Sequence, residues 1–108
     1  MRKAEVYRNG ILAGFLNEEP GNGYWFIYDK SYVSNETNPS ISLTIPKNKI
    51  KHHSEVLFPF FFNMLSEGLN RKLQSRYLKI DEKDHFGFLL ATAEYDTIGA
   101  VTVKQILS

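Results

Sequence analysis

Short runs of alternating apolar and polar residues fill the first half of the chain, a pattern typical of β-strands. Runs 5–8 and 11–16 flank Asn9-Gly10, which predicts a hairpin because a type I′ turn needs positive φ at both central residues. A third run, 24–28, is aromatic and also favours a strand. The residues before it, 17–23, are rich in turn formers and predict a loop.

The next segment contains a fourth candidate strand. Residues 41–45 alternate strictly, so that Ile41, Leu43 and Ile45 share one face and predict a half-buried strand. The polar residues before it, 29–39, are predicted to be irregular, with room for a short turn. The basic residues after it are predicted to form a loop.

The most apolar run, 57–68, lies where this β-rich half gives way to a helical half. Pro59 suits the first turn of a helix, because its φ is already helical and its missing N–H leaves no intrahelical bond unmade. The run predicts a short helix over about 55–64 that closes one end of a small sheet. Its polar end, 63–68, is expected to be displayed to a partner.

Two further helices and a last strand are predicted after this run. A helix over about 67–79 is expected, and Asp81 is expected to cap a third helix, with Asp84 in a weak capping-box role. The buried stripe of the first of these helices is expected at Leu65, Leu69, Leu73 and Tyr77. Residues 98–106 predict a strand that returns to the sheet. The order indicates an α+β fold: a small antiparallel sheet or half-open barrel of about five strands, with two or three helices on one side or end.

Composition narrows the class of protein. The 108 residues fit one domain, 1–108, and at 43% hydrophobic they can build a core. The absence of cysteine excludes disulfides and thiolate metal sites. The basic N-terminus leads into a strand pattern without an apolar signal core, which favours the cytoplasm, and the ends Met1 and Ser108 suit a complete small protein. With a net charge of +1, binding to nucleic acid or membrane would need a local patch.

Three segments together resemble the N-terminal subdomain of the HipA family, bacterial serine/threonine kinases that act as the toxins of toxin–antitoxin pairs. They are 6–16, with its Asn-Gly hairpin; 59–68, with Phe-Phe, Asn, an acid and Gly; and 96–101, with Asp-x-x-Gly-Ala. The segments follow the family's order, although Ser66 stands where the family usually has Pro, and Glu94-Tyr95 replaces a glycine-rich stretch.

The kinase domain of a HipA toxin has no counterpart in this sequence. The chain resembles the stand-alone HipS proteins of split, three-component HipBST systems, and this resemblance implies an antitoxin role. The implied partner is a shortened, HipT-type kinase, with or without a HipB-type DNA-binding protein, and no cofactor is implied. The residues leave open whether the chain is a natural small protein or a domain of a longer product.

Patterns for catalysis and for metal binding are missing from the sequence. Gly21-Asn22-Gly23 lacks the spacing and the lysine of a phosphate loop, and no kinase acids occur at the required spacing. His52 and His53 would point apart in an extended chain, and His85 has no set of partners with zinc-site spacing. Ser66 is expected to cap a helix. We therefore expect no enzyme, no metal and no cofactor.

The partner-binding surface is expected at the polar end of the apolar run, because the phenylalanines commit the run's other side to the core. Its predicted residues are Asn63, Ser66, Glu67 and Asn70, with Arg71 at the edge. The expected function is a non-catalytic interaction module that binds and restrains a HipA-like kinase.

Two basic clusters carry the alternative function, a nucleic-acid-contacting accessory module of a repressor complex. One lies in loop 47–53 and the other on helix 67–79. Their main cations are Lys47, Lys49, Lys51, Lys72, Arg76 and Lys79. These residues could contact phosphates, dock an acidic patch of a kinase or form a solvated face, and direct binding of nucleic acid is expected to be the minor role.

Overall fold

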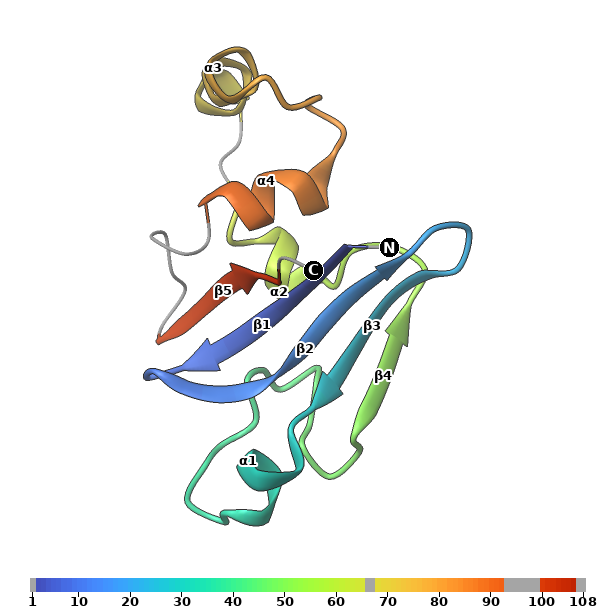
Figure 1. The fold of residues 1–108 in the computed structure, drawn as a ribbon, viewed down its shortest axis with the longest axis vertical. Coiled ribbons are helices and arrows are strands. Elements are labelled where there is room, and N and C mark those ends of the chain that lie inside the picture. Colours follow the sequence, from blue (N-terminus) through green and yellow to red (C-terminus); the bar gives the residue numbers. More distant parts are fainter. Residues whose placement is uncertain (1, 66–67, 93–99, 107–108) are drawn as a thin grey trace.

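The computed structural model describes residues 2–65, 68–92 and 100–106, in which five strands form one antiparallel sheet accompanied by four helices (Figure 1). The strands are β1 (Arg2–Arg8), β2 (Ile11–Glu19), β3 (Gly23–Tyr28), β4 (Lys51–Ser54) and β5 (Val101–Gln105), in the order β4-β3-β2-β1-β5. The helices are α1 (Lys30–Ser34), α2 (Pro59–Phe62), α3 (Gly68–Leu78) and α4 (His85–Thr92). The predicted α+β fold is confirmed, as an open sheet with one helix more than expected.

The β1–β2 hairpin turns at the predicted Asn-Gly pair, where Asn9 and Gly10 both have positive φ, 51° and 77°. β2 then continues past its predicted end at Leu16, because its last residues pair with β3. At Gly14 the neighbouring strand comes so close that a Cβ atom would lie 2.4 Å from the carbonyl oxygen of Ile27. Glycine is therefore the residue that lets β2 and β3 pack at this point.

The fourth strand lies outside the segment predicted for it. Ser42 and Ile45 form an isolated bridge, so residues 41–45 turn back on themselves; Ile41 and Ile45 are buried while Leu43 is 99% exposed. The hydroxyl of Tyr28 holds both ends of this turn, since it donates to Ile45 O and accepts from Ile41 N at 3.1 Å. Apolar residues at alternate positions, which predicted a strand here, therefore belong to a turn whose first and last residues are buried.

The fourth strand is instead β4, which begins within the segment predicted to be a basic loop, 47–53, and ends one residue after it. It pairs with β3, with His52 opposite Phe26 and His53 opposite Trp25. The ring of His52 lies on the core side beside Tyr28, and the ring of His53 contacts Trp25 on the other face, so the two histidines point apart as predicted. The sequence of β4 is polar and shows no alternation of apolar and polar residues, so it does not predict a strand.

Helix α1 occupies a segment predicted to be irregular apart from a short turn. Asp29 caps it, because its side chain accepts from Tyr32 N at 3.3 Å. Tyr32 is buried, and its hydroxyl donates to Pro39 O at 2.6 Å. One buried side chain thus ties this helix to the loop that follows it.

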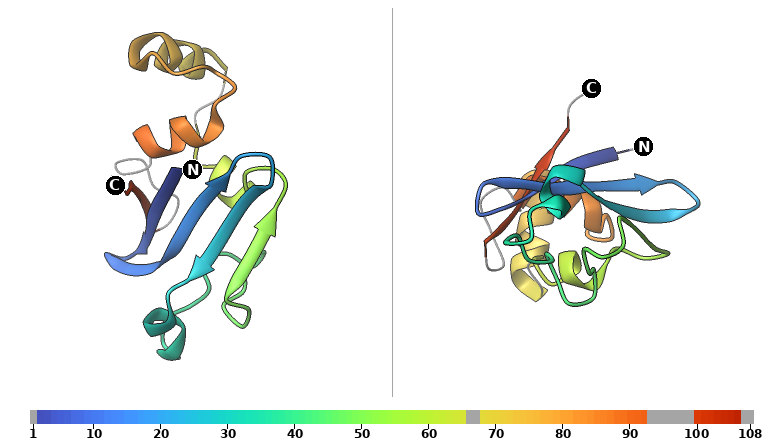
Figure 2. Two further views of the ribbon diagram at one scale, coloured as in Figure 1. Left: turned by 45° about the vertical axis from the view of Figure 1, so that its right-hand side comes forward. Right: turned by 90° about the horizontal axis from the view of Figure 1, so that it is seen from below.

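The apolar run closes the core as predicted, but its helix is only one turn long. α2 begins at Pro59, the predicted first-turn residue, and its Phe61 is fully buried with its ring centroid 6.0 Å from that of Phe26. Leu57, Phe58, Met64 and Leu65 are buried on either side of the helix. In the right-hand view of Figure 2, α2, α3 and α4 lie on the same side of the sheet.

The predicted stripe of the second helix is wrong in α3. Leu73 is 52% and Tyr77 87% exposed, and the burial of Leu69 lies outside what the structure describes. Leu65 is buried but precedes the helix. Within 70–78, the part of α3 whose burial the structure describes, the buried side chain is instead Arg71, because the helix packs on α4 and not on the sheet (Figure 1).

The predicted cap of the third helix is also displaced. Asp84 caps α4, because its Oδ1 accepts from Gly87 N at 3.0 Å. Asp81 accepts from Lys83 N at 2.8 Å and so closes the turn before the helix. The turn predicted at 95–97 lies outside the described residues, and β5 forms the predicted last strand.

Candidate partner-binding surface

Two of the five predicted partner-binding residues lie on the surface of the described structure. Asn63 is exposed directly after α2, where its N–H donates to Pro59 O at 2.9 Å, and Asn70 is exposed on α3. Ser66 and Glu67, with the cap expected at Ser66, lie outside the described residues. Asn63 and Asn70 are therefore exposed residues of the predicted surface.

An apolar cleft of about 370 Å³ borders Asn63. Its lining residues are Val56, Leu57, Pro59, Phe62, Asn63 and His85. Val56 and Phe62 are exposed large hydrophobic residues. The prediction from sequence chose polar residues here and missed this apolar part, although one signal was present: consecutive phenylalanines on a one-turn helix cannot all face the core.

Arg71, predicted at the edge of the surface, is turned inward and is only 9% exposed. Its guanidinium lies over the ring of Phe88, 4.3 Å from the centroid, and its Nη2 donates to Glu82 O at 2.6 Å. The same atom lies 2.7 Å from His85 Nδ1, while the buried Nε has no hydrogen-bond partner in the part of the chain that the structure describes. Arg71 therefore fixes α3 against α4 from the inside.

The contact with Arg71 selects the neutral form of His85, because a guanidinium can only donate to a ring nitrogen that carries no proton. Burial and the nearby charge of Arg71 both lower the pKa of His85, and Asp84 opposes them. His85 also packs its ring edge-on against Phe62, with centroids 5.0 Å apart. The cleft and the α3–α4 junction thus share one side chain.

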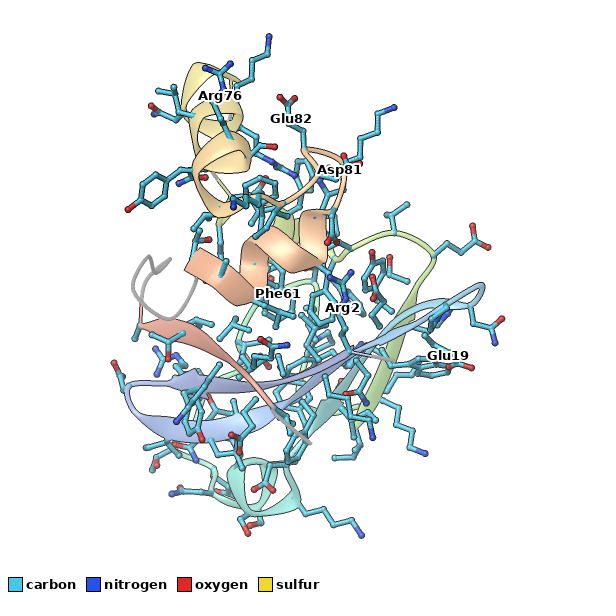
Figure 3. All side chains as sticks on the ribbon, turned by 45° about the horizontal axis from the view of Figure 1, so that its top comes forward. Arg2, Glu19, Phe61, Arg76, Asp81 and Glu82 are labelled. Carbon is cyan, nitrogen blue, oxygen red and sulfur yellow. The ribbon has the colours of Figure 1, made fainter. Side chains whose placement is uncertain are left out.

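A second arginine ties α4 to the sheet. Arg2 on β1 donates from Nε to Glu18 at 2.8 Å. It also donates from Nη1 and Nη2 to Asp84, at 2.9 and 2.8 Å. Figure 3 labels Arg2 below α4. Its hydrogen bonds are the main reason that the pKa of Asp84 is lowered. The guanidinium also lies 5.4 Å from the centroid of the Phe86 ring. Sequence reasoning missed this clamp, because its partners are far apart in the chain.

The two basic clusters are not brought together. Segment 47–53 lies beside β3 and α1, whereas α3 lies at the other end of the long axis (Figure 1). In the first cluster Lys49 and Lys51 are exposed, but Lys47 donates to backbone carbonyls of the preceding loop, including Asn35 O at 3.3 Å. In the second cluster Lys72, Arg76 and Lys79 are all exposed. The cations therefore form two separate patches.

In 2–65, 68–92 and 100–106, no three His, Asp or Glu side chains gather in a way that could hold a metal ion. Over the same residues, every helix is too short or too polar to cross a lipid bilayer.

Comparisons with known proteins agree on one family. The family model described as HipA N-terminal domain matches residues 4–104. An uncharacterized protein of Haemophilus influenzae is 31% identical over 105 residues, which cover 97% of this chain and 93% of the relative. The solved structure of the N-terminal domain of HipA toxin is 29% identical, with a TM-score of 0.75, and the match covers 100% of this chain and 95% of that one. This chain therefore belongs to the HipA N-terminal domain family.

Proposed function

We propose that this protein is a non-catalytic interaction module that binds a HipA-like serine/threonine kinase and restrains it as an antitoxin. Membership of the HipA N-terminal domain family supports a role connected with toxin–antitoxin systems. The proposed partner is a shortened, HipT-type kinase, with or without a HipB-type DNA-binding protein. The proposed site of action is the cytoplasm.

The observation that carries the proposal is the apolar cleft beside Asn63. Val56 and Phe62 expose apolar surface there, although the nearby phenylalanines Phe58 and Phe61 are buried. A cleft that is apolar at its centre and bordered by a side-chain amide suits a protein segment, because interface cores are apolar and their rims polar. We propose that Ser66 and Glu67 extend this surface toward Asn70.

The alternative, a nucleic-acid-contacting module of a repressor complex, has weaker support. The affinity of a protein for nucleic acid rises with the number of cationic side chains that reach the phosphates of the same strand or duplex. The cations of 47–53 and those of α3 lie at opposite ends of the molecule, so a single duplex segment would meet one patch at a time. Specific binding by the isolated protein, with loss of affinity as salt rises, would favour this alternative.

The test is co-expression with the HipT-type kinase of the same genome, followed by co-purification and a growth assay for toxicity. Wild type should co-purify with the kinase and relieve its toxicity. The variant Val56→Glu/Asn63→Arg should lose both effects while it keeps its circular dichroism spectrum and melting temperature, because both residues are exposed.

Leu43→Glu is the matched control, since it places a charge on a fully exposed leucine of the 41–45 turn. It should bind as wild type does. Failure of wild type to bind the kinase would end the proposal. Normal binding by the Val56/Asn63 variant would keep the function and move the surface elsewhere.

A further inference from the structure

A second apolar groove runs between the last turns of α3 and the end of α4. Its volume is about 810 Å³. Leu73, Tyr77 and Leu78 line it from α3, and Ala91 and Thr92 line it from α4. The three α3 side chains are all exposed large hydrophobic residues. Their spacing marks one helix face whose apolar side chains have no cover among the described residues.

The exposed charges on α3 are all of one sign. The sequence of α3 contains no acidic residue, and its basic side chains are Arg71, Lys72 and Arg76, with Lys79 directly after it. Arg71 is buried and engaged with α4, which leaves Lys72, Arg76 and Lys79 exposed. Figure 3 labels Arg76 at the far end of the molecule from the sheet. In the described structure no ion pair joins these cations to an acid.

The groove is held in place before any partner arrives. Arg71 fixes the start of α3 to α4 through the ring of Phe88 and through Glu82 O. At the other end, Ile80 N donates to Ser75 O at 3.2 Å and closes the helix against the loop that leads to α4. A surface that is already ordered loses less conformational entropy on binding.

We propose that this groove, defined by Leu73, Tyr77, Leu78, Ala91 and Thr92, is a docking surface for a protein segment with apolar side chains bordered by Asp or Glu. The apolar floor would take the apolar side chains, and the cations of α3 would pair with the carboxylates. This proposal rests on the proposed function: the kinase supplies the segment, and the groove acts together with the cleft beside Asn63.

Charge and chemistry select this occupant over others. Two copies of the chain that paired groove to groove would bring the cations of their α3 helices close together, and like charges at an interface oppose association. A nucleic acid would use the cations but would gain little from the apolar side chains of Leu73 and Leu78, because its exposed phosphates and sugars are polar. An apolar segment with acidic borders satisfies both parts of the surface.

The decisive experiment titrates the purified kinase with wild type and with Leu73→Glu/Tyr77→Glu, by calorimetry at low and at high salt. The double variant should bind at least about tenfold more weakly, as expected when central apolar contacts of an interface are replaced by charge. Leu43→Glu is again the matched control and should bind as wild type does. Lys72→Glu/Arg76→Glu should also bind more weakly, with a smaller dependence on salt than wild type.

The outcomes separate this inference from the function on which it rests. Absence of binding by wild type would overturn both. Wild-type binding with unchanged affinity of the Leu73/Tyr77 variant would overturn the groove alone. The groove proposal would also be overturned if light scattering found that wild type is a dimer and the Leu73/Tyr77 variant is a monomer. It would be overturned as well if wild type bound DNA or anionic vesicles but not the kinase segment, and these substitutions abolished that binding.

Discussion

The sheet and helix α3 bury their apolar residues to very different extents. Ala4, Val6, Leu16 and Val103, from three neighbouring strands, are completely covered within this chain. α3 instead exposes Leu73 and Tyr77, and the buried residue among 70–78, where burial is described, is Arg71. The sheet therefore draws its stability from apolar burial, whereas the described contacts of α3 with α4 are the hydrogen bond and the cation–π contact of Arg71, and its apolar side chains Leu73 and Tyr77 stay exposed.

Removal of a sheet-covering side chain should have the largest effect. Phe61→Ala should lower the free energy of unfolding by about 3–5 kcal/mol, because it leaves a cavity under Phe26. Tyr77→Ala on α3 should change it by no more than about 0.5 kcal/mol, since that ring is exposed. Urea unfolding measures both. Equal losses of unfolding free energy in the two variants would show that the sheet and α3 do not differ in apolar burial.

Loss of the inward arginine should affect α3 more than the sheet. Arg71→Ala removes the hydrogen bond to Glu82 O and the contact with Phe88. The free energy of unfolding should fall by about 1.5–3 kcal/mol, the usual contribution of a hydrogen bond that involves a charged group. Amide hydrogen exchange should accelerate throughout α3, while β1 and β2 keep their protection. Uniform acceleration across both regions would mean that α3 and the sheet unfold as one unit.

Acid should loosen the helical region first. The pKa of His85 in the folded protein is lowered from its ordinary 6.5, so the stability that its neutral form supplies is present above pH 6.5 and is lost as pH falls through the folded-state pKa. Asp84, whose pKa is lowered from 3.8, follows: its stabilisation is present above pH 3.8 and is lost at still lower pH.

Two variants separate these steps. In urea unfolding measured from pH 7 to pH 3, His85→Gln should remove the upper part of the pH dependence, and Asp84→Asn should remove the lower part. Wild-type stability that stays constant between pH 7 and pH 5 would contradict the role given to His85.

The smallest effect concerns the end of α3. Lys79 has a φ of 58°, a left-handed conformation that is costly for any residue with a Cβ atom. Lys79→Gly should stabilise the protein by about 0.5–1 kcal/mol, whereas Lys72→Gly inside the helix should destabilise it by about 1 kcal/mol. Thermal unfolding compares the two, and a loss of stability in the first variant would contradict a strained helix end.

Local chemistry made parts of the candidate site predictable. Pro59 correctly indicated a first helical turn, although the helix was predicted to begin at about residue 55 and begins at Pro59. The phenylalanine cluster correctly indicated a buried run with an outward side at Asn63. The exposed Phe62 and the cleft were missed, because which side chain of a short helix faces outward depends on the sheet beneath it. The clamp between Arg2 and Asp84 was missed for a similar reason, since 82 positions separate the two residues.

By itself, the sequence determined the features that depend on neighbouring residues: the Asn9-Gly10 hairpin, the aromatic strand β3 and the helical turn at Pro59. Only the tertiary structure decided that the polar segment 51–54 becomes a strand, because β3 offers it a free edge to pair with. It also decided that Arg71, and not Leu73, faces inward on α3. Helical periodicity groups the side chains that share a face, but the elements packed nearby determine which face is covered.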